Sequence, residues 1–204
     1  AIPSLNKNKR KVILSNLEDL RISTFQIPTL DELSSSNIDF NDIKPIKIED
    51  LLHRDIVPPI KSLIKKSINN NVICVTGAGG SIGSELCLQM LDFNPKKIIL
   101  LERNELALYK IQKETEKFFP QIDICPVLGD CTNLFFIKKI FFEHKVNVIF
   151  HAAAYKHVPL VESNPFQALK NNILSTRVIC EASTSVKAKL MMLISSDKAV
   201  RPTN

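Results

Sequence analysis

The feature that most constrains the fold of this chain is an alternation of short apolar runs with longer amphipathic stretches from Val72 onward. Near-continuous runs of Val, Ile and Leu are typical of strands that are covered on both faces. Such runs occupy residues 72–76, 97–102, 122–130, 146–153 and 189–196. The stretches between them predict helices near 81–93, 104–118, 132–144 and 164–185. This alternation predicts an α/β fold with a doubly wound, Rossmann-like parallel sheet.

The first 60 residues follow a different pattern. Thr29 and Glu32 have the spacing of a capping box, and prolines interrupt the segment that follows. We therefore expect two parts. Residues 1–60 are interpreted as a linker and the tail of another unit, and residues 61–204 as the sheet domain.

The third expected helix carries an unusually broad apolar surface around Lys138 and Lys139. Its apolar residues are Phe135, Phe136, Ile137, Ile140, Phe141 and Phe142. We interpret this surface as core packing rather than as an aromatic binding site.

Composition excludes several classes of protein. Hydrophobic residues make up 45% and charged residues 24%, which indicates a compact globular chain. The net charge of +6 is spread over small clusters, as on solvated helix faces. Because the chain has no Trp and two Tyr, platforms for stacking bases are scarce. We predict no nucleic-acid partner, although a basic interaction protein stays as an alternative.

The cysteines indicate free thiols in a reducing cytoplasm rather than a metal site. The five are at positions 74, 87, 125, 131 and 180, without a CxxC pair, so no metal is predicted. No apolar run reaches the roughly 18 residues of a membrane helix, so no membrane segment is predicted in this chain.

A glycine-rich stretch, VTGAGGSIGSE, covers residues 75–85 and holds four of the five glycines. Gly77, Gly80 and Gly83 have GxxGxxG spacing between a predicted strand and a predicted helix that opens with Ser81 and Ile82. Such a loop lets a pyrophosphate approach backbone N–H groups at a positive helix end. The stretch predicts a dinucleotide site, with a tight structural turn as the alternative.

The ends of the second and third predicted strands agree with this interpretation. Glu102 could accept hydrogen bonds from the adenosine ribose, and Arg103 could pair with a 2′-phosphate. The predicted cofactor is therefore NAD or NADP, with Glu102 slightly favouring NAD. Asp130 is expected near the adenine amino group, and the adjoining Cys131 is included in the same surface. Solvated strand ends are the alternative for these residues.

Two further segments, HAAAYKHVPLVESNP (151–165) and LISSDKAVRPTN (193–204), carry a family resemblance together with TGAGGSIGSEL. From about Val72 to Asn204 the chain resembles the extended short-chain dehydrogenase/reductase family. Within it, the chain is similar to the polysaccharide-biosynthesis branch of nucleotide-sugar 4,6-dehydratases, which act on UDP-N-acetylglucosamine-type substrates. The motifs AIPS, PTLDEL and IEDLLHRD resemble the region that joins a nucleotide-binding-like regulatory domain, preceded by membrane helices, to the catalytic domain. The resemblance implies a membrane-anchored parent protein with this part in the cytoplasm.

The resemblance also implies catalytic residues. In the family, bound NAD(P) takes a hydride from sugar C4, a base removes the C5 proton, water leaves C6 and the hydride returns to C6. Asp197 matches the acid that protonates the leaving hydroxyl, and Lys198 matches the base. Ser196 stands where the family usually has Thr and keeps the hydroxyl that binds the sugar 4-oxygen.

Other matched positions concern the cofactor. Ala152, Ala153 and Ala154 form the small-residue wall beside the nicotinamide ribose. Lys156 is expected to contact substrate or cofactor, with a surface ion pair as the alternative. Asn172 matches the Asn that opens the family's NxxGT pattern, in which Ser replaces Gly here.

The family's Tyr or Met and its ribose-binding Lys would fall near positions 206 and 210, after Asn204. The chain alone is therefore expected to bind dinucleotide weakly or not at all and to lack complete turnover. An epimerase of the same fold and a truncated, non-catalytic nucleotide-binding protein are the alternatives. The sequence leaves the oligomeric state open, and a homo-oligomer is one alternative.

Overall fold

The computed structural model describes residues 25–26, 44–45 and 58–196. The chain divides into two compact units, Ala1–Pro59 and Ile60–Asn204. In the first unit, strands β1 (Phe25–Gln26) and β2 (Lys44–Pro45) pair antiparallel. The capping box expected at positions 29–32 lies outside the described residues.

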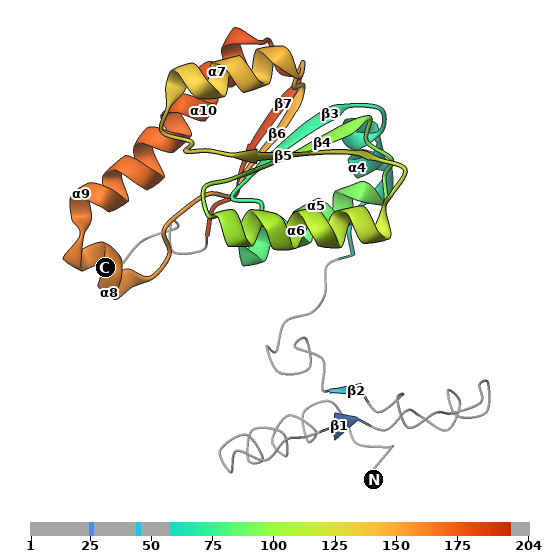
Figure 1. The fold of residues 1–204 in the computed structure, drawn as a ribbon, viewed down its shortest axis with the longest axis horizontal. Coiled ribbons are helices and arrows are strands. Elements are labelled where there is room, and N and C mark those ends of the chain that lie inside the picture. The colour runs from blue at the N-terminus through green and yellow to red at the C-terminus, as the bar shows by residue number, and fades with distance from the viewer. Residues whose placement is uncertain (1–24, 27–43, 46–57, 197–204) are drawn as a thin grey trace. The chain divides into compact units, whose positions relative to one another are not determined.

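A five-stranded parallel sheet forms the centre of the second unit (Figure 1). Its strands are β3 (Val72–Thr76), β4 (Lys97–Glu102), β5 (Asp123–Leu128), β6 (Val148–His151) and β7 (Leu190–Leu193). The strand order is β5-β4-β3-β6-β7, so the chain runs outward from β3 to β5 and then returns to build the other half. The prediction of a doubly wound parallel sheet is confirmed.

Helices cover both faces of the sheet (Figure 1). They are α4 (Lys61–Ile68), α5 (Ser81–Leu91), α6 (Glu105–Phe118), α7 (Leu134–Glu143), α8 (Val158–Ser163), α9 (Pro165–Ala168) and α10 (Ser175–Ser185). Side chains alternate along β3: Ile73 and Val75 pack into the core under α4, α5 and α6, while Val72 and Cys74 pack into the core under α7 and α10. Burial on two faces explains why the central strands have no polar alternation.

The last predicted helix, near 164–185, is interrupted in the structure. A π-helical segment, η2 (Leu169–Leu174), joins α9 to α10. The Ser175 hydroxyl donates a hydrogen bond to Asn171 O, and the Thr176 hydroxyl donates to Asn172 O at 2.7 Å. Such side-chain bonds to the preceding turn compete with regular helical bonding, which apolar periodicity does not register.

The expected core role of the aromatic helix is correct for one of its faces. Ile137 and Phe141, which lie four residues apart on one face of α7, are fully buried. Phe135 and Phe142 are instead 82% and 79% exposed. The prediction was wrong for these two residues because a helix on a sheet buries one stripe of its surface. The edge strands β5 and β7 are likewise more exposed than the central strands.

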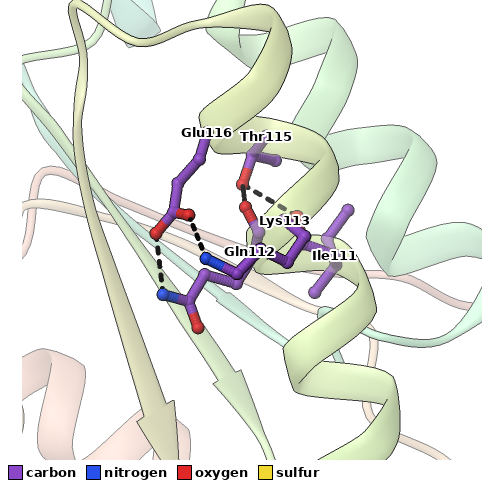
Figure 2. A network of polar contacts seen from close by, with 5 residues as sticks. All are labelled: Ile111, Gln112, Lys113, Thr115 and Glu116. Carbon is purple, nitrogen blue, oxygen red and sulfur yellow. Dashed lines mark hydrogen bonds and ion pairs between the residues drawn. The ribbon is translucent and has the colours of Figure 1, made fainter.

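Polar side chains of α6 form hydrogen bonds and an ion pair with one another and with the helix backbone (Figure 2). Gln112 donates to Glu116 Oε1 at 2.7 Å, and Lys113 Nζ lies 2.9 Å from Glu116 Oε2. These two donors, Gln112 first, lower the pKa of the Glu116 carboxyl. The Thr115 hydroxyl is buried on the inner side and donates to Ile111 O at 2.8 Å. α6 therefore satisfies its polar groups locally while its apolar stripe packs on the sheet.

Candidate dinucleotide-binding site

Three glycines are required by the packing of the loop after β3. Gly77 has a φ of +66°, and a Cβ added there would lie 2.8 Å from Ala153 Cα. A Cβ on Gly83 would lie 2.0 Å from Gly77 O, and one on Gly79 would lie 2.5 Å from Ala107 Cβ. Any side chain at these positions would push apart the loop, the helix and the segment after β6.

Gly80 differs from the other three glycines. Its φ of −75° and ψ of 166° suit any residue, and it begins α5 without a side-chain cap. A Cβ there would meet Gly77 O at 3.2 Å and no other heavy atom within 4 Å among the described residues, apart from its chain neighbours and the backbone of α5. The first N–H groups of α5 lack partners within the helix. The absent side chain therefore opens a positive helix end to a ligand.

A cleft of about 250 Å³ lies beside this loop, at the carboxyl ends of the strands. It brings together the predicted residues Gly77, Gly80, Glu102, Arg103, Asp130, Cys131, Ala152, Ala153 and Ala154. Residues that the sequence did not single out complete it: Gly79, Leu101, Asn104, Ala107, Gly129, Tyr155 and Asn171. Small residues and three charged side chains, Glu102, Arg103 and Asp130, thus dominate its lining.

Glu102, at the end of β4, is held by backbone donors. Its Oε2 accepts from Gly79 N–H at 3.1 Å, and its Oε1 accepts from the N–H groups of Arg103 and Asn104 at 2.9 and 3.0 Å. Two bonds fill the lone pairs of Oε1, whereas Oε2 keeps one. Glu102 can therefore accept one further hydrogen bond from a ligand hydroxyl.

Arg103 crosses the cleft to the segment after β6. Its guanidinium lies 4.5 Å from the centre of the Tyr155 ring, donates to the Tyr155 hydroxyl and donates to Asn171 Oδ1 at 3.1 Å. Asn172 fixes the Tyr155 backbone: its Oδ1 accepts from Tyr155 N–H at 2.8 Å and its Nδ2 donates to Tyr155 O at 3.0 Å. Asn172 thus fixes the backbone of Tyr155, which lines the cleft, while Asn171 lines the cleft itself.

The end of β5 supplies the opposite side. Asp130 lines the cleft, and its Oδ1 accepts from Thr132 N–H at 2.8 Å. Among the described residues, no protein donor bonds to its other oxygen. Cys131 is buried, and burial followed by the nearby Asp130 carboxylate raises its pKa to about 12. Cys131 therefore remains a neutral thiol that packs rather than reacts.

Sequence reasoning passed over His151, which ends β6 and is 1% exposed. Burial lowers the pKa of its imidazole to about 4, so the ring is neutral near pH 7. The signal that could have singled it out is a histidine within an otherwise apolar strand, directly before the three alanines.

Several predicted residues do not line the cleft. Lys156 lines a second cavity of about 430 Å³, together with His157 and residues of α8 and α9. The two cavities share Ala154 and Tyr155. Ser196 follows β7, is exposed and lines neither cavity. Asp197 and Lys198 lie outside the described residues.

Residues 73–204 match the sequence profile of a family described as "Polysaccharide biosynthesis protein". The chain belongs to this polysaccharide biosynthesis family. Within the described part of the chain, no cluster of three or more His, Cys, Asp or Glu side chains could hold a metal ion in this family member. The helices described here are all too short or too polar to cross a bilayer.

Curated relatives of this polysaccharide biosynthesis family member are much longer than the chain itself. The chain is 40% identical to the capsular polysaccharide biosynthesis protein CapD of Staphylococcus aureus, over all of the chain and 34% of the relative. It is 31% identical to a UDP-N-acetylglucosamine 4,6-dehydratase (inverting) of Campylobacter jejuni, over 67% of the chain and 39% of the relative. The chain thus spans about a third of the length of these relatives.

Solved structures agree with the fold of the family member. Pen from Bacillus thuringiensis aligns with a TM-score of 0.61 at 28% identity, over 67% of the chain and 40% of Pen. UDP-glucose 4-epimerase of Bifidobacterium longum, solved with NAD⁺ and UDP, aligns with a TM-score of 0.56 at 20% identity, over 63% of the chain and 38% of the epimerase. The second likeness extends to the fold alone.

Proposed function

We propose that this chain forms the dinucleotide-binding part of a nucleotide-sugar 4,6-dehydratase in polysaccharide biosynthesis. The observation that carries the proposal is the combination at the cleft of an uncapped helix end at Gly80 and a free acceptor on Glu102. A diphosphate fits the first, because N–H groups and the helix dipole favour an anion there. A ribose hydroxyl fits the second.

NAD is the preferred cofactor in this proposal. The negative charge of Glu102 would repel a 2′-phosphate, and Arg103 is already engaged by Tyr155 and Asn171. Asp130 would accept from the adenine amino group through its free oxygen. When bound, the nicotinamide accepts a hydride from sugar C4 and returns it to C6.

The cleft of about 250 Å³ is smaller than most complete small-molecule sites, which span roughly 300–1,000 Å³. We assign it to the adenosine diphosphate half of the cofactor. The adjoining cavity of about 430 Å³ carries Lys156 and His157 and could take the nucleotide sugar. The shared wall of Ala154 and Tyr155 would bring the two ligands together.

The proton-transfer residues follow from the family resemblance. Ser196 would hold the sugar 4-oxygen by its hydroxyl, Lys198 would take the C5 proton and Asp197 would give a proton to the departing 6-hydroxyl. The C6–O bond breaks as the C5 electrons form the C5–C6 double bond, and water leaves. In this assignment Lys198 receives the proton from C5, and Asp197 supplies the proton that leaves with the 6-hydroxyl as water.

We also propose that residues 1–60 are the end of a preceding domain and its linker in a membrane-anchored parent protein. The similarity to CapD covers the whole chain, including this segment. A relative from Methanocaldococcus jannaschii is named a membrane protein and is 41% identical over 69% of the chain. Expression of the complete protein with a fluorescent tag and fractionation of membranes would test this location; recovery of the protein in the supernatant would contradict it.

The activity is tested on the protein that carries this chain, with NAD⁺ and UDP-N-acetylglucosamine. A dehydratase gives a product lighter by one water molecule, whereas an epimerase gives a product of unchanged mass. Calorimetry of the same complete protein with NAD⁺ tests cofactor binding separately. Unaltered sugar in the first experiment, with NAD⁺ bound in the second, would contradict the dehydratase while keeping the dinucleotide site.

A further inference from the structure

His151 joins the strand before the glycine loop to the start of α10. Its Nδ1 is 2.7 Å from Thr76 Oγ1, and Thr76 directly precedes the glycine loop. Its Nε2 is 3.2 Å from Thr176 Oγ1 and 3.4 Å from Ser175 Oγ, at the junction of η2 and α10. The imidazole therefore bridges β3 and the segment that carries Asn171 and Asn172.

The hydroxyl groups of Ser175 and Thr176 already donate their protons to backbone carbonyls. Thr176 Oγ1 donates to Asn172 O at 2.7 Å, and Ser175 Oγ donates to Asn171 O. Since a hydroxyl has one proton, both oxygens can only accept from His151. Nε2 must then carry the imidazole proton, and Nδ1 is bare.

The bare Nδ1 specifies the direction of the bond on the sheet side. It accepts from the Thr76 hydroxyl, so the chain of donors runs from Thr76 through His151 to Thr176 and on to the Asn172 carbonyl. A doubly protonated ring would require the Thr76 hydroxyl to turn and accept from Nδ1–H, and it would place a positive charge in a buried site. Of the two neutral tautomers, the Nε2–H form is the one that supplies a donor to Thr176 and an acceptor to the Thr76 hydroxyl.

We propose that His151, as the neutral Nε2–H tautomer, is a positioning residue that holds the glycine loop in register with the η2 segment. This inference rests on the proposed dinucleotide site. Thr76 sets the start of the loop that receives the diphosphate, and Asn171 and Asn172 hold Arg103 and Tyr155 across the cleft. Removal of the Thr176 hydroxyl, at the α10 end of the bridge, should therefore change the conformation of the glycine loop.

The first experiment determines the tautomer in the wild-type 204-residue chain. A long-range ¹H–¹⁵N spectrum at pH 7 distinguishes a protonated from a bare nitrogen at each position of the His151 ring. We expect a protonated Nε2 and a bare Nδ1. A protonated Nδ1, or a charged ring, would overturn the inference whatever the chain binds.

The second experiment cuts the bridge in Thr176→Val. We expect the amide resonances of Gly77 and Gly80 in the 204-residue chain to shift and the affinity of the complete protein for NAD⁺ to fall roughly five-fold, as for one lost hydrogen bond of about 1 kcal/mol. Thr184→Val is the matched control, because Thr184 makes the same bond to the preceding turn, to Cys180 O at 3.0 Å, on the exposed face of α10. It should leave both readouts unchanged.

Thr176→Ser, which keeps the hydroxyl, should restore both readouts and shows that the effect belongs to the bridge rather than to helix stability. Unchanged Gly77 and Gly80 resonances in folded Thr176→Val, or equal shifts in Thr184→Val, would overturn the inference. A complete protein that binds no NAD⁺ would instead count against the proposed function, while the amide shifts in the 204-residue chain would still decide the coupling.

Discussion

Glu102 Oε2 accepts a hydrogen bond from the Gly79 N–H at 3.1 Å, across 23 positions of sequence. The same carboxylate binds two backbone amides through Oε1. Glu102 therefore both shapes the glycine loop and presents its remaining lone pair to the cleft, which makes it the natural first target for mutation.

Replacement of Glu102 by Gln should weaken NAD⁺ binding by about ten-fold or more. The variant loses a charged acceptor, worth roughly 1.5–3 kcal/mol per hydrogen bond, and turns an amide donor toward backbone donors. Calorimetry with NAD⁺ and NADP⁺ measures the effect, and the preference for NAD⁺ should narrow as the negative charge is removed. Glu105→Gln, in the exposed first turn of α6, is the control; an equal loss in it would remove Glu102 from the site.

Substitution by Ala should mainly reduce stability at Gly77 and mainly reduce NAD⁺ binding at Gly80. Gly77→Ala places a Cβ at positive φ against Ala153 and should lower the free energy of unfolding by about 1–3 kcal/mol or more. Gly80→Ala should cost less stability than Gly77→Ala, because its backbone is ordinary and its Cβ meets Gly77 O at 3.2 Å, but it should weaken NAD⁺ binding by entering the space proposed for the diphosphate. Urea unfolding and calorimetry separate the two effects. Full NAD⁺ affinity in Gly80→Ala would argue against that placement.

The stability of the chain should fall as the pH is lowered from about 6.5 to about 4, because of His151. Burial holds its pKa near 4 in the folded state, against 6.5 for an ordinary histidine. In this pH window the imidazole is protonated in the unfolded chain and neutral in the folded chain. His151 therefore contributes about 3 kcal/mol to the free energy of unfolding above pH 6.5, and this contribution is lost as the pH falls to about 4. Urea unfolding of wild type and His151→Gln at several pH values gives the difference; parallel pH profiles would contradict this origin.

Phe141 and Phe142 should differ sharply although they are neighbours on α7. Phe141→Ala removes a fully buried ring and should cost about 3–5 kcal/mol of unfolding free energy. Phe142→Ala changes a ring that is 79% exposed and should cost less than about 0.5 kcal/mol. Thermal and urea unfolding test the pair. A large loss in Phe142→Ala would mean that this ring is covered in solution.

Local patterns in the sequence determined the order and type of the elements in the second unit. The runs of Val, Ile and Leu predicted the five strands, and the glycine spacing predicted a loop between β3 and α5. These features depend on periodicity and on backbone freedom, which neighbouring residues in the chain decide. The resemblance of three motifs also predicted the family, which the profile match confirms.

The tertiary structure alone decided which side chains meet. That Arg103 lies on Tyr155, that His151 links Thr76 to Thr176 and that Phe142 faces outward depend on how strands and helices distant in sequence are stacked. Hydrogen-bond partners and burial are properties of that packing and leave no periodic trace in the chain. The sequence therefore determined a doubly wound α/β fold, and packing alone determined the shape of the cleft and the partners of its buried histidine.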